Sequence, residues 1–177
     1  ICLQESGKWP KNTAQSFSKT IGYKYYSYNT KNGNSYFSKY KIENVNIFKD
    51  EDISKFADIK KINISNNESF YLVNCHLNSF GISKEEIEYI NDIENIVKES
   101  ETHGKSVIHK LKSGFERRTQ STDLLLENLP DDTLPLIICG DFNDTPLSYT
   151  YSQMSKAGMQ DAFISASRGI GQTYCGP

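Results

Sequence analysis

The chain has 177 residues, of which 37% are hydrophobic and 24% are charged, a composition typical of a globular domain with one sizeable core. Its formal net charge of −2 gives no broad attraction for nucleic acid, which lowers the case for a nuclease without excluding one. No apolar run reaches the length of a membrane span, and no signal peptide, repeat or linker is visible. We therefore predict a single domain over residues 1–177, and its location stays open.

Apolar and turn-forming residues predict a strand, a helix and a hairpin in the first part of the chain. Residues 1–5 are typical of a strand, and the following helix is expected to begin at Pro10 and to end at Gly22. Alternating aromatic residues indicate another strand over residues 23–28. The turn at 29–34, rich in Asn and Gly, then returns the chain to form a hairpin.

Strands and helices alternate through the rest of the sequence. A capping box of Ser83 and Glu86 predicts a helix, and Gly114 is expected to weaken a longer helix and can break it. The other predicted elements are, in chain order, a strand (42–48), the two strands of a second hairpin (59–64 and 69–75), a polar loop (99–105), the longer helix (107–129), a buried strand (136–138) and a short helix (148–158).

Three of the apolar strands end on polar side chains. The first ends at Glu5, and a later one ends near His76. A third is followed by Asp141 and Asn143, and because residues two apart on an extended chain point the same way, these two can face one pocket. Sites in layered α/β proteins collect at strand ends, so we predict that the four side chains share a site.

This set of side chains suits a metal-bound phosphate, because a carboxylate can bind a cation or accept a proton while an amide donates to oxygen. Each residue also has a simpler interpretation. Asp141 follows Gly140 and could belong to an ordinary turn, Glu5 could be a surface acid, and His76 could be a satisfied core histidine. These interpretations weaken because one pattern accounts for all of the residues together.

The same motifs resemble the endonuclease/exonuclease/phosphatase family, the metal-dependent phosphoesterases with a DNase I-like fold. The matching pieces are Leu-Gln-Glu, Tyr-Phe-Ser-Lys-Tyr-Lys-Ile, Val-Asn-Cys-His-Leu and Gly-Asp-Phe-Asn-Asp-Thr-Pro, at residues 3–5, 36–42, 73–77 and 140–146. Residues 169–174 also look like the segment that precedes the last strand in bacterial members. The resemblance implies an α/β fold, a four-layered sandwich with two mixed, mainly antiparallel sheets flanked by helices.

The resemblance and the chemistry together give each residue a role, with Mg²⁺ or Mn²⁺ as the cofactor. Glu5 is the candidate metal ligand, since Mg²⁺ keeps several waters and needs one or two carboxylates. Asp141 would hold or deprotonate the attacking water, or join a second metal. Asn143 would hydrogen-bond the phosphate, and a protonated His76 would donate to a phosphate oxygen as charge develops there.

Two basic residues are weaker candidates for substrate binding. Lys39 could border the site, although a lysine at a hairpin edge is usually just solvated. Arg117, with Arg118 beside it, could contact a substrate phosphate, although an exposed basic turn of helix explains both residues as well.

The cysteines show no metal-binding spacing. Cys2, Cys75 and Cys139 each lie in a predicted core strand, where a free cysteine behaves as a small hydrophobe. We favour reduced thiols and no zinc, and a disulfide between strands is the less favoured alternative.

Family members begin with a strand that carries an Asn near the metal and end with an Asp-His pair, and neither occurs in this sequence. We therefore read the chain as a fragment, missing the first strand and the last strand or strands. The parent is expected to be an active enzyme and the fragment to be inactive or nearly so. Exposed sheet edges would then favour self-association, and no protein partner is evident.

The leading prediction is a metal-dependent hydrolase of phosphoester bonds. Its substrate could be nucleic acid, a phospholipid headgroup or a nucleotide, because the loops that select it cannot be decoded from the sequence. One alternative is a noncatalytic binding module that keeps the fold, although the presence of all the candidate site residues argues against it. Another is a structural or interaction domain whose motifs are coincidental, which widely separated strand ends would favour.

Overall fold

A computed structural model describes residues 1–10, 12–48, 50–79, 101–131 and 133–166. The chain forms two compact units, residues 1–143 and 144–177, and each is described by itself. The helix predicted at Ser83, Cys175 and the motif at residues 169–174 lie outside the described residues.

The first sheet of the larger unit has three antiparallel strands in the order β1-β3-β2. These strands are β1 (Cys2–Leu3), β2 (Tyr25–Tyr28) and β3 (Ser35–Ser38). The hairpin of β2 and β3 is as predicted. The first strand is shorter than predicted, because the chain turns at Glu5, which has a φ of 57°.

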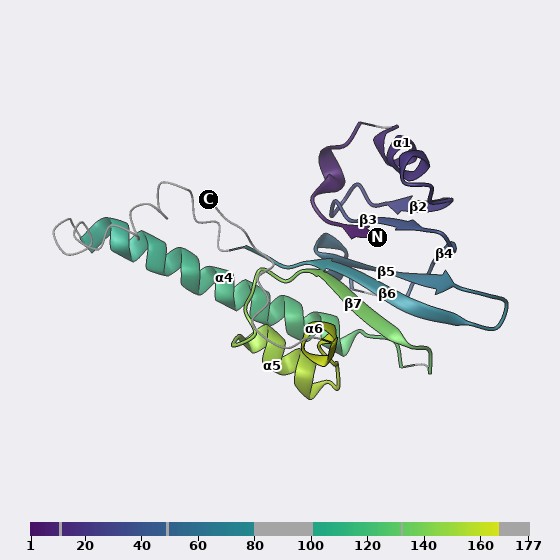
Figure 1. The fold of residues 1–177 in the computed structure, drawn as a ribbon. Helices are drawn as coiled ribbons and strands as arrows, with labels where there is room; N and C mark the ends of the chain where they lie inside the picture. The colour runs from purple at the N-terminus through teal and green to yellow at the C-terminus, as the bar shows by residue number, and fades with distance from the viewer. Residues whose placement is uncertain (11, 49, 80–100, 132, 167–177) are drawn as a thin grey trace. The chain divides into compact units, whose positions relative to one another are not determined.

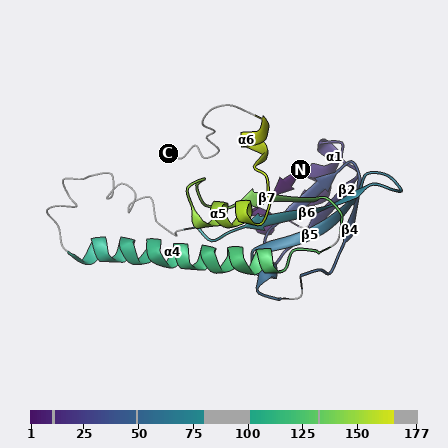
Figure 2. The same ribbon diagram turned by 90° about the horizontal axis from the view of Figure 1, so that it is seen from below.

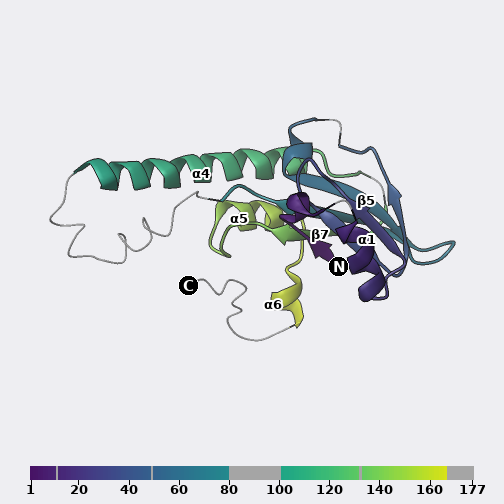
Figure 3. The same cartoon turned by 90° about the horizontal axis from the view of Figure 1, so that it is seen from above.

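Aromatic side chains join this sheet to helix α1 (Thr13–Thr20). Phe37 of β3 is 1% exposed, and its ring centroid lies 4.9 Å from that of Phe17 and 6.3 Å from that of Trp9. The contact between Phe17 and Phe37 is edge-to-face, an arrangement that adds to the stability that burial gives. The helix therefore covers the outer face of the sheet, as Figures 1 and 3 show.

The second sheet is mixed, with the order β4-β5-β6-β7. Antiparallel pairs join β4 to β5 and β5 to β6, whereas β6 and β7 are parallel. Its strands are β4 (Lys41–Asn44), β5 (Ala57–Asn63), β6 (Ser69–His76) and β7 (Leu136–Asp141). Two sheets flanked by helices confirm the predicted α/β sandwich.

Side chains on the two faces of this second sheet differ in polarity. Ile59 and Val73 are paired residues of β5 and β6 and are at most 3% exposed. Their neighbours Asp58 and Asn74 are also paired and, because strand side chains alternate, lie on the opposite face. Asn74 hydrogen-bonds to Leu3 and therefore faces the first sheet, so the layer between the sheets is partly polar.

Helix α4 (Glu101–Glu127) corrects two expectations. The polar segment predicted to be a loop is helical from residue 101, and the helix does not break at Gly114. Gly114 is buried, and a single glycine costs a helix interior only about 1 kcal/mol, which a long helix tolerates. The C-terminal end of α4 lies near the 3-10 helix η2 (Ile53–Lys55). Figure 2 shows α4 as one continuous helix.

The smaller unit contains two helices, α5 (Tyr149–Lys156) and α6 (Ala162–Ala166). The hydroxyl of Ser148 accepts the backbone N–H of Tyr151 at 3.2 Å and so caps α5, the short helix expected over residues 148–158. Asp161 accepts the backbone N–H groups of Phe163 and Ile164 at the start of α6. Across the described residues, no helix combines the length and apolar character that crossing a bilayer requires.

Candidate active site

Glu5 is held at the end of β1 by a tight backbone turn. The next residue, Ser6, donates its backbone N–H to Gly33 O at 2.9 Å and its hydroxyl to the same oxygen at 2.6 Å. Gly33 has a φ of +74°, and a Cβ there would lie 3.0 Å from the backbone nitrogen of Gly7. Only glycine fits such an approach easily, so the hairpin of β2 and β3 fixes the position of Glu5.

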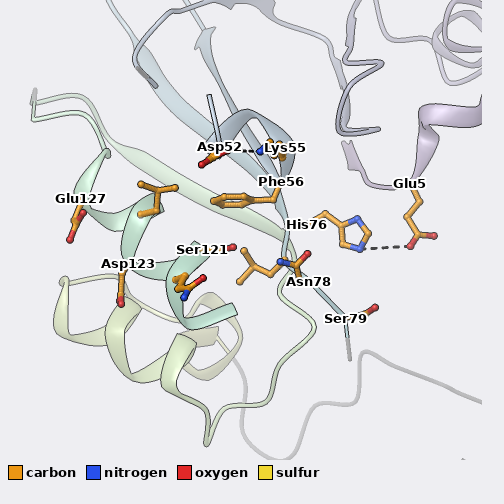
Figure 4. Close-up of a pocket in the computed structure, with 13 residues that line it drawn as sticks. Glu5, Asp52, Lys55, Phe56, His76, Asn78, Ser79, Ser121, Asp123 and Glu127 are labelled. Atoms are coloured by element: carbon orange, nitrogen blue, oxygen red, sulfur yellow. Dashed lines mark hydrogen bonds and ion pairs between the residues drawn. The ribbon is translucent and has the colours of Figure 1, made fainter. Parts of the chain in front are cut away.

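His76 is the last residue of β6, and its ring is directed toward Glu5 (Figure 4). Its Nε2 lies 3.7 Å from Oε1 of Glu5, and its backbone N–H donates to Phe56 O at 2.7 Å. The Glu5 side chain is 78% exposed and that of His76 is 24% exposed. An acid from one sheet and an imidazole from the other thus meet at a solvent-accessible edge.

Asp141 lies beside His76 because the two residues are paired in the parallel ladder of β6 and β7. Paired residues of neighbouring strands point to the same face, so both side chains share the face that carries Asn74. The backbone N–H of Leu77 donates to Asp141 O at 2.9 Å, which continues the pairing past the end of β6. Asp141 is exposed, so its carboxylate can reach water or a ligand.

Asn143 shapes the loop that leaves Asp141. Its backbone N–H donates to Oδ1 of Asp141 at 2.9 Å, and its Nδ2 donates to Leu77 O at 2.7 Å. Its φ is 49°, a conformation that asparagine tolerates better than most residues. An amide NH₂ carries two hydrogens, so Asn143 can hold the loop and still donate to a ligand.

The structure does not bring Lys39 and Arg117 to this group of residues. Ser35 begins β3 and pairs with Leu3, so this end of β3 lies near Glu5. Lys39 follows the other end of β3, roughly 13 Å along the strand from Ser35. Its Nζ lies 5.7 Å from the centroid of the Tyr23 ring. Arg117 is exposed on α4 and does not line the cavity that contains Glu5 and His76.

The neighbouring Arg118 has a structural position that the sequence interpretation missed. It is 1% exposed, and its Nη1 donates to Asn78 O at 2.9 Å, two residues after His76. Helical spacing could have indicated that Arg118 is buried, because it lies on the same face of α4 as the buried residues Gly114, Ser121 and Leu125. That stripe is mostly small or polar, so hydrophobic periodicity did not reveal it.

Asn74 ties the two sheets together behind the site and was not singled out from the sequence. It is fully buried, accepts from Nε2 of Gln4 at 2.7 Å, and donates from Nδ2 to Leu3 O at 3.1 Å. Its backbone carbonyl accepts from Nδ2 of Asn34 at 2.9 Å. Buried amides with these bonds fix how β1, and therefore Glu5, sits over β6.

Tyr36 makes a second polar link between the sheets. Its hydroxyl lies within hydrogen-bond distance of the Asp58 carboxylate and donates to Asp58 O at 2.8 Å. The hydroxyl also accepts the backbone N–H of Asn74 at 3.1 Å. Burial, together with the nearby Asp58 charge, raises the pKa of Tyr36, so this side chain stays a neutral structural donor.

A cavity of about 840 Å³ extends from Glu5 and His76 toward η2 and the C-terminal end of α4. Its lining includes the acidic residues Asp52, Asp123 and Glu127 (Figure 4). Lys55 lies in the same wall and forms an ion pair with Asp52. The volume is that of a small-molecule site, which leaves room for a ligand beside the two candidate residues.

Within the described ranges, no three His, Cys, Asp or Glu side chains are arranged as a preformed metal cage. Mg²⁺ does not require such a cage, because it is commonly held by one or two carboxylates and completes its shell with water and substrate oxygens. The exposed carboxylate of Glu5, which lines the cavity, fits that requirement.

An α/β sandwich with a glutamate and a histidine facing each other at the ends of its strands, and an aspartate paired with that histidine, fits a phosphoesterase- or nuclease-type domain. A comparison with known families agrees: the Endonuclease/Exonuclease/phosphatase family matches residues 1–176, and the chain belongs to this family. Members are usually metal-dependent hydrolases. Comparisons with curated proteins and with solved structures gave no match.

Proposed function

We propose that the protein hydrolyses phosphoester bonds with the help of Mg²⁺ or Mn²⁺, at the edge where Glu5, His76 and Asp141 meet. The observation that supports this most strongly is the convergence of the two sheets. Nε2 of His76 lies 3.7 Å from Oε1 of Glu5, and His76 is paired with Asp141 in the ladder of β6 and β7.

Backbone conformation supports the same location. In the described part of the chain, the non-glycine residues with positive φ are Glu5 and Asn143, and both belong to the candidate site. A left-handed conformation costs a non-glycine residue on the order of 1 kcal/mol or more, and such costs concentrate at functional sites. Two sites of strain flanking the same edge favour a functional role over a surface turn.

Each side chain has a role that its position allows. The cation, when bound, supplies positive charge at a phosphate oxygen, and Glu5 would hold it. Asp141 would orient the attacking water and accept its proton, since the carboxylate is exposed and fixed by Asn143. His76, when protonated, would donate to a phosphate oxygen as negative charge develops there, while the carboxylate of Glu5 stabilises the imidazolium.

A panel assay tests this proposal with the natural full-length gene product that contains these 177 residues. Bis-nitrophenyl phosphate, plasmid DNA, phosphoinositide vesicles and nucleotides are incubated with Mg²⁺ or Mn²⁺, and in parallel with a chelator. We expect product from at least one substrate with metal and none with chelator. The His76→Gln variant should be slower, and His109→Gln, the same change at an exposed position of α4, should match the unmutated protein.

A folded protein that converts no member of the panel in either metal would contradict the proposal and favour a noncatalytic binding module. Equal rates with metal and with chelator would contradict the role of the cation.

A further inference from the structure

A pair of cysteines joins the two sheets close to the proposed active site. Cys2 lies in β1 of the first sheet and Cys139 in β7 of the second. Glu5 follows Cys2 by three residues, and Asp141 follows Cys139 by two. Any covalent bond between these cysteines would therefore connect the two strands that carry the candidate acidic groups.

The two cysteines lie on neighbouring strands of different sheets. Residues of β1 and β7 lie close in space, and the thiol of Cys139 donates to Val73 O at 3.5 Å. The surrounding bonds agree with this placement. Asn74, which donates to the carbonyl of Leu3 next to Cys2, is the ladder partner of Cys139.

Accessibility separates this pair from Cys75. Cys2 and Cys139 are both partly exposed, whereas Cys75 is 0% exposed and its thiol donates to the carbonyl of Cys139 at 3.6 Å. Side-chain alternation places Cys75 on the face of β6 opposite to Asn74, away from the first sheet. Cys75 is therefore poorly placed to pair with Cys2.

We propose that Cys2 and Cys139 form a disulfide on oxidation and that this bond is a reversible link between the two sheets. Hydrogen peroxide is the oxidant. One sulfur attacks a peroxide oxygen, the O–O bond breaks, and a sulfenic acid and a water molecule result. The second sulfur then attacks the sulfenic sulfur, the S–S bond forms, and the hydroxyl leaves as a second water with the thiol proton.

The link would constrain a long segment of the unfolded chain. A disulfide stabilises chiefly by limiting the unfolded state, and the effect grows with the length of the closed loop, here residues 2–139. Strand β1 contains only two residues, so a covalent anchor would also hold the turn that positions Glu5. We expect the oxidised chain to unfold roughly 10 °C above the reduced chain.

Disulfide mapping on the unmutated chain tests the proposal directly. The folded protein is treated with hydrogen peroxide, free thiols are alkylated in denaturant, and nonreduced peptides are analysed by mass spectrometry. We expect a linked peptide pair containing Cys2 and Cys139, with Cys75 alkylated, and dithiothreitol should reverse both the link and the rise in unfolding temperature. Alkylation of both partners after oxidation, or a bond from either one to another cysteine, would overturn the proposal.

Two variants separate the link from general effects of oxidation. Cys139→Ser should lose the linked peptides and the peroxide-induced shift, whereas Cys75→Ala should keep both. A peroxide-induced shift of equal size in Cys139→Ser would contradict the assignment, whatever the stability of either variant in the reduced state.

Discussion

Replacing Asp141 by asparagine should lower kcat/KM of the full-length gene product about 10³-fold, the loss typical of removing a positioned general base. The substitution keeps the oxygen that accepts the backbone N–H of Asn143 at 2.9 Å, so the loop should persist. It removes the negative charge with which Asp141 would accept a proton from water. The rate is measured with the best substrate of the panel in saturating Mg²⁺.

Asp131→Asn is the matched control for this variant. Asp131 is exposed and precedes the first residue of β7, whereas Asp141 is the last residue of that strand. Loss of the Asp131 carboxylate should therefore leave kcat/KM unchanged. If Asp141→Asn retained more than roughly a tenth of the original rate while remaining folded, the proposed role of this carboxylate would be wrong.

Replacing Gly140 by alanine should destabilise the chain by about 4 kcal/mol, from overpacking and backbone strain together. Gly140 has a φ of +147°, and a Cβ there would lie 1.8 Å from the carbonyl oxygen of Cys75. That oxygen belongs to the neighbouring strand and cannot rotate away as a side chain can. Strand β7 would have to separate from β6 where His76 and Asp141 are paired.

Urea unfolding followed by circular dichroism measures this change in the free energy of unfolding. Gly22→Ala is the matched control, because Gly22 also has a positive φ, +71°, but no atom lies within 4 Å of its added Cβ. It should cost only about 1 kcal/mol, the price of the backbone conformation alone. Equal losses in the two variants would show that the close approach of β7 to β6 is unimportant.

The sequence could predict the strand ends because local patterns determine them. Apolar runs before Glu5, His76 and Asp141 predict three strands, and His76 lies beside both acidic residues, although β1 ends at Leu3 rather than at Glu5. The short helix over residues 148–158 was predicted as well, and the Ser148 cap that begins it involves only nearby residues. Local patterns were less reliable in α4, where a polar stretch expected to be a loop and the glycine at position 114 are both helical.

Contacts between sheets were harder to predict, because they depend on how distant segments stack. Gln4 and Asn74 are ordinary polar residues in the sequence, and their hydrogen bond appears only once β1 lies over β6. Arg118 is similar, since an arginine pair on a helix is usually solvated, and only the turn after β6 supplies its buried acceptor. Lys39 was a weak candidate to border the site, and strand direction places it at the far end of β3 from Glu5.

Manganese binding by the purified chain is the most direct test of the central claim, that these strand ends form one cation-dependent centre. Mn²⁺ is titrated into three proteins, the unmutated chain, Glu5→Gln and Glu68→Gln, and free Mn²⁺ is measured by electron paramagnetic resonance. Glu68→Gln is the control, because it makes the same change at an exposed position in the hairpin of β5 and β6. We predict that Glu5→Gln weakens Mn²⁺ binding at least roughly tenfold, while Glu68→Gln binds as the unmutated chain does. Equal Mn²⁺ affinity in all three proteins would contradict the account.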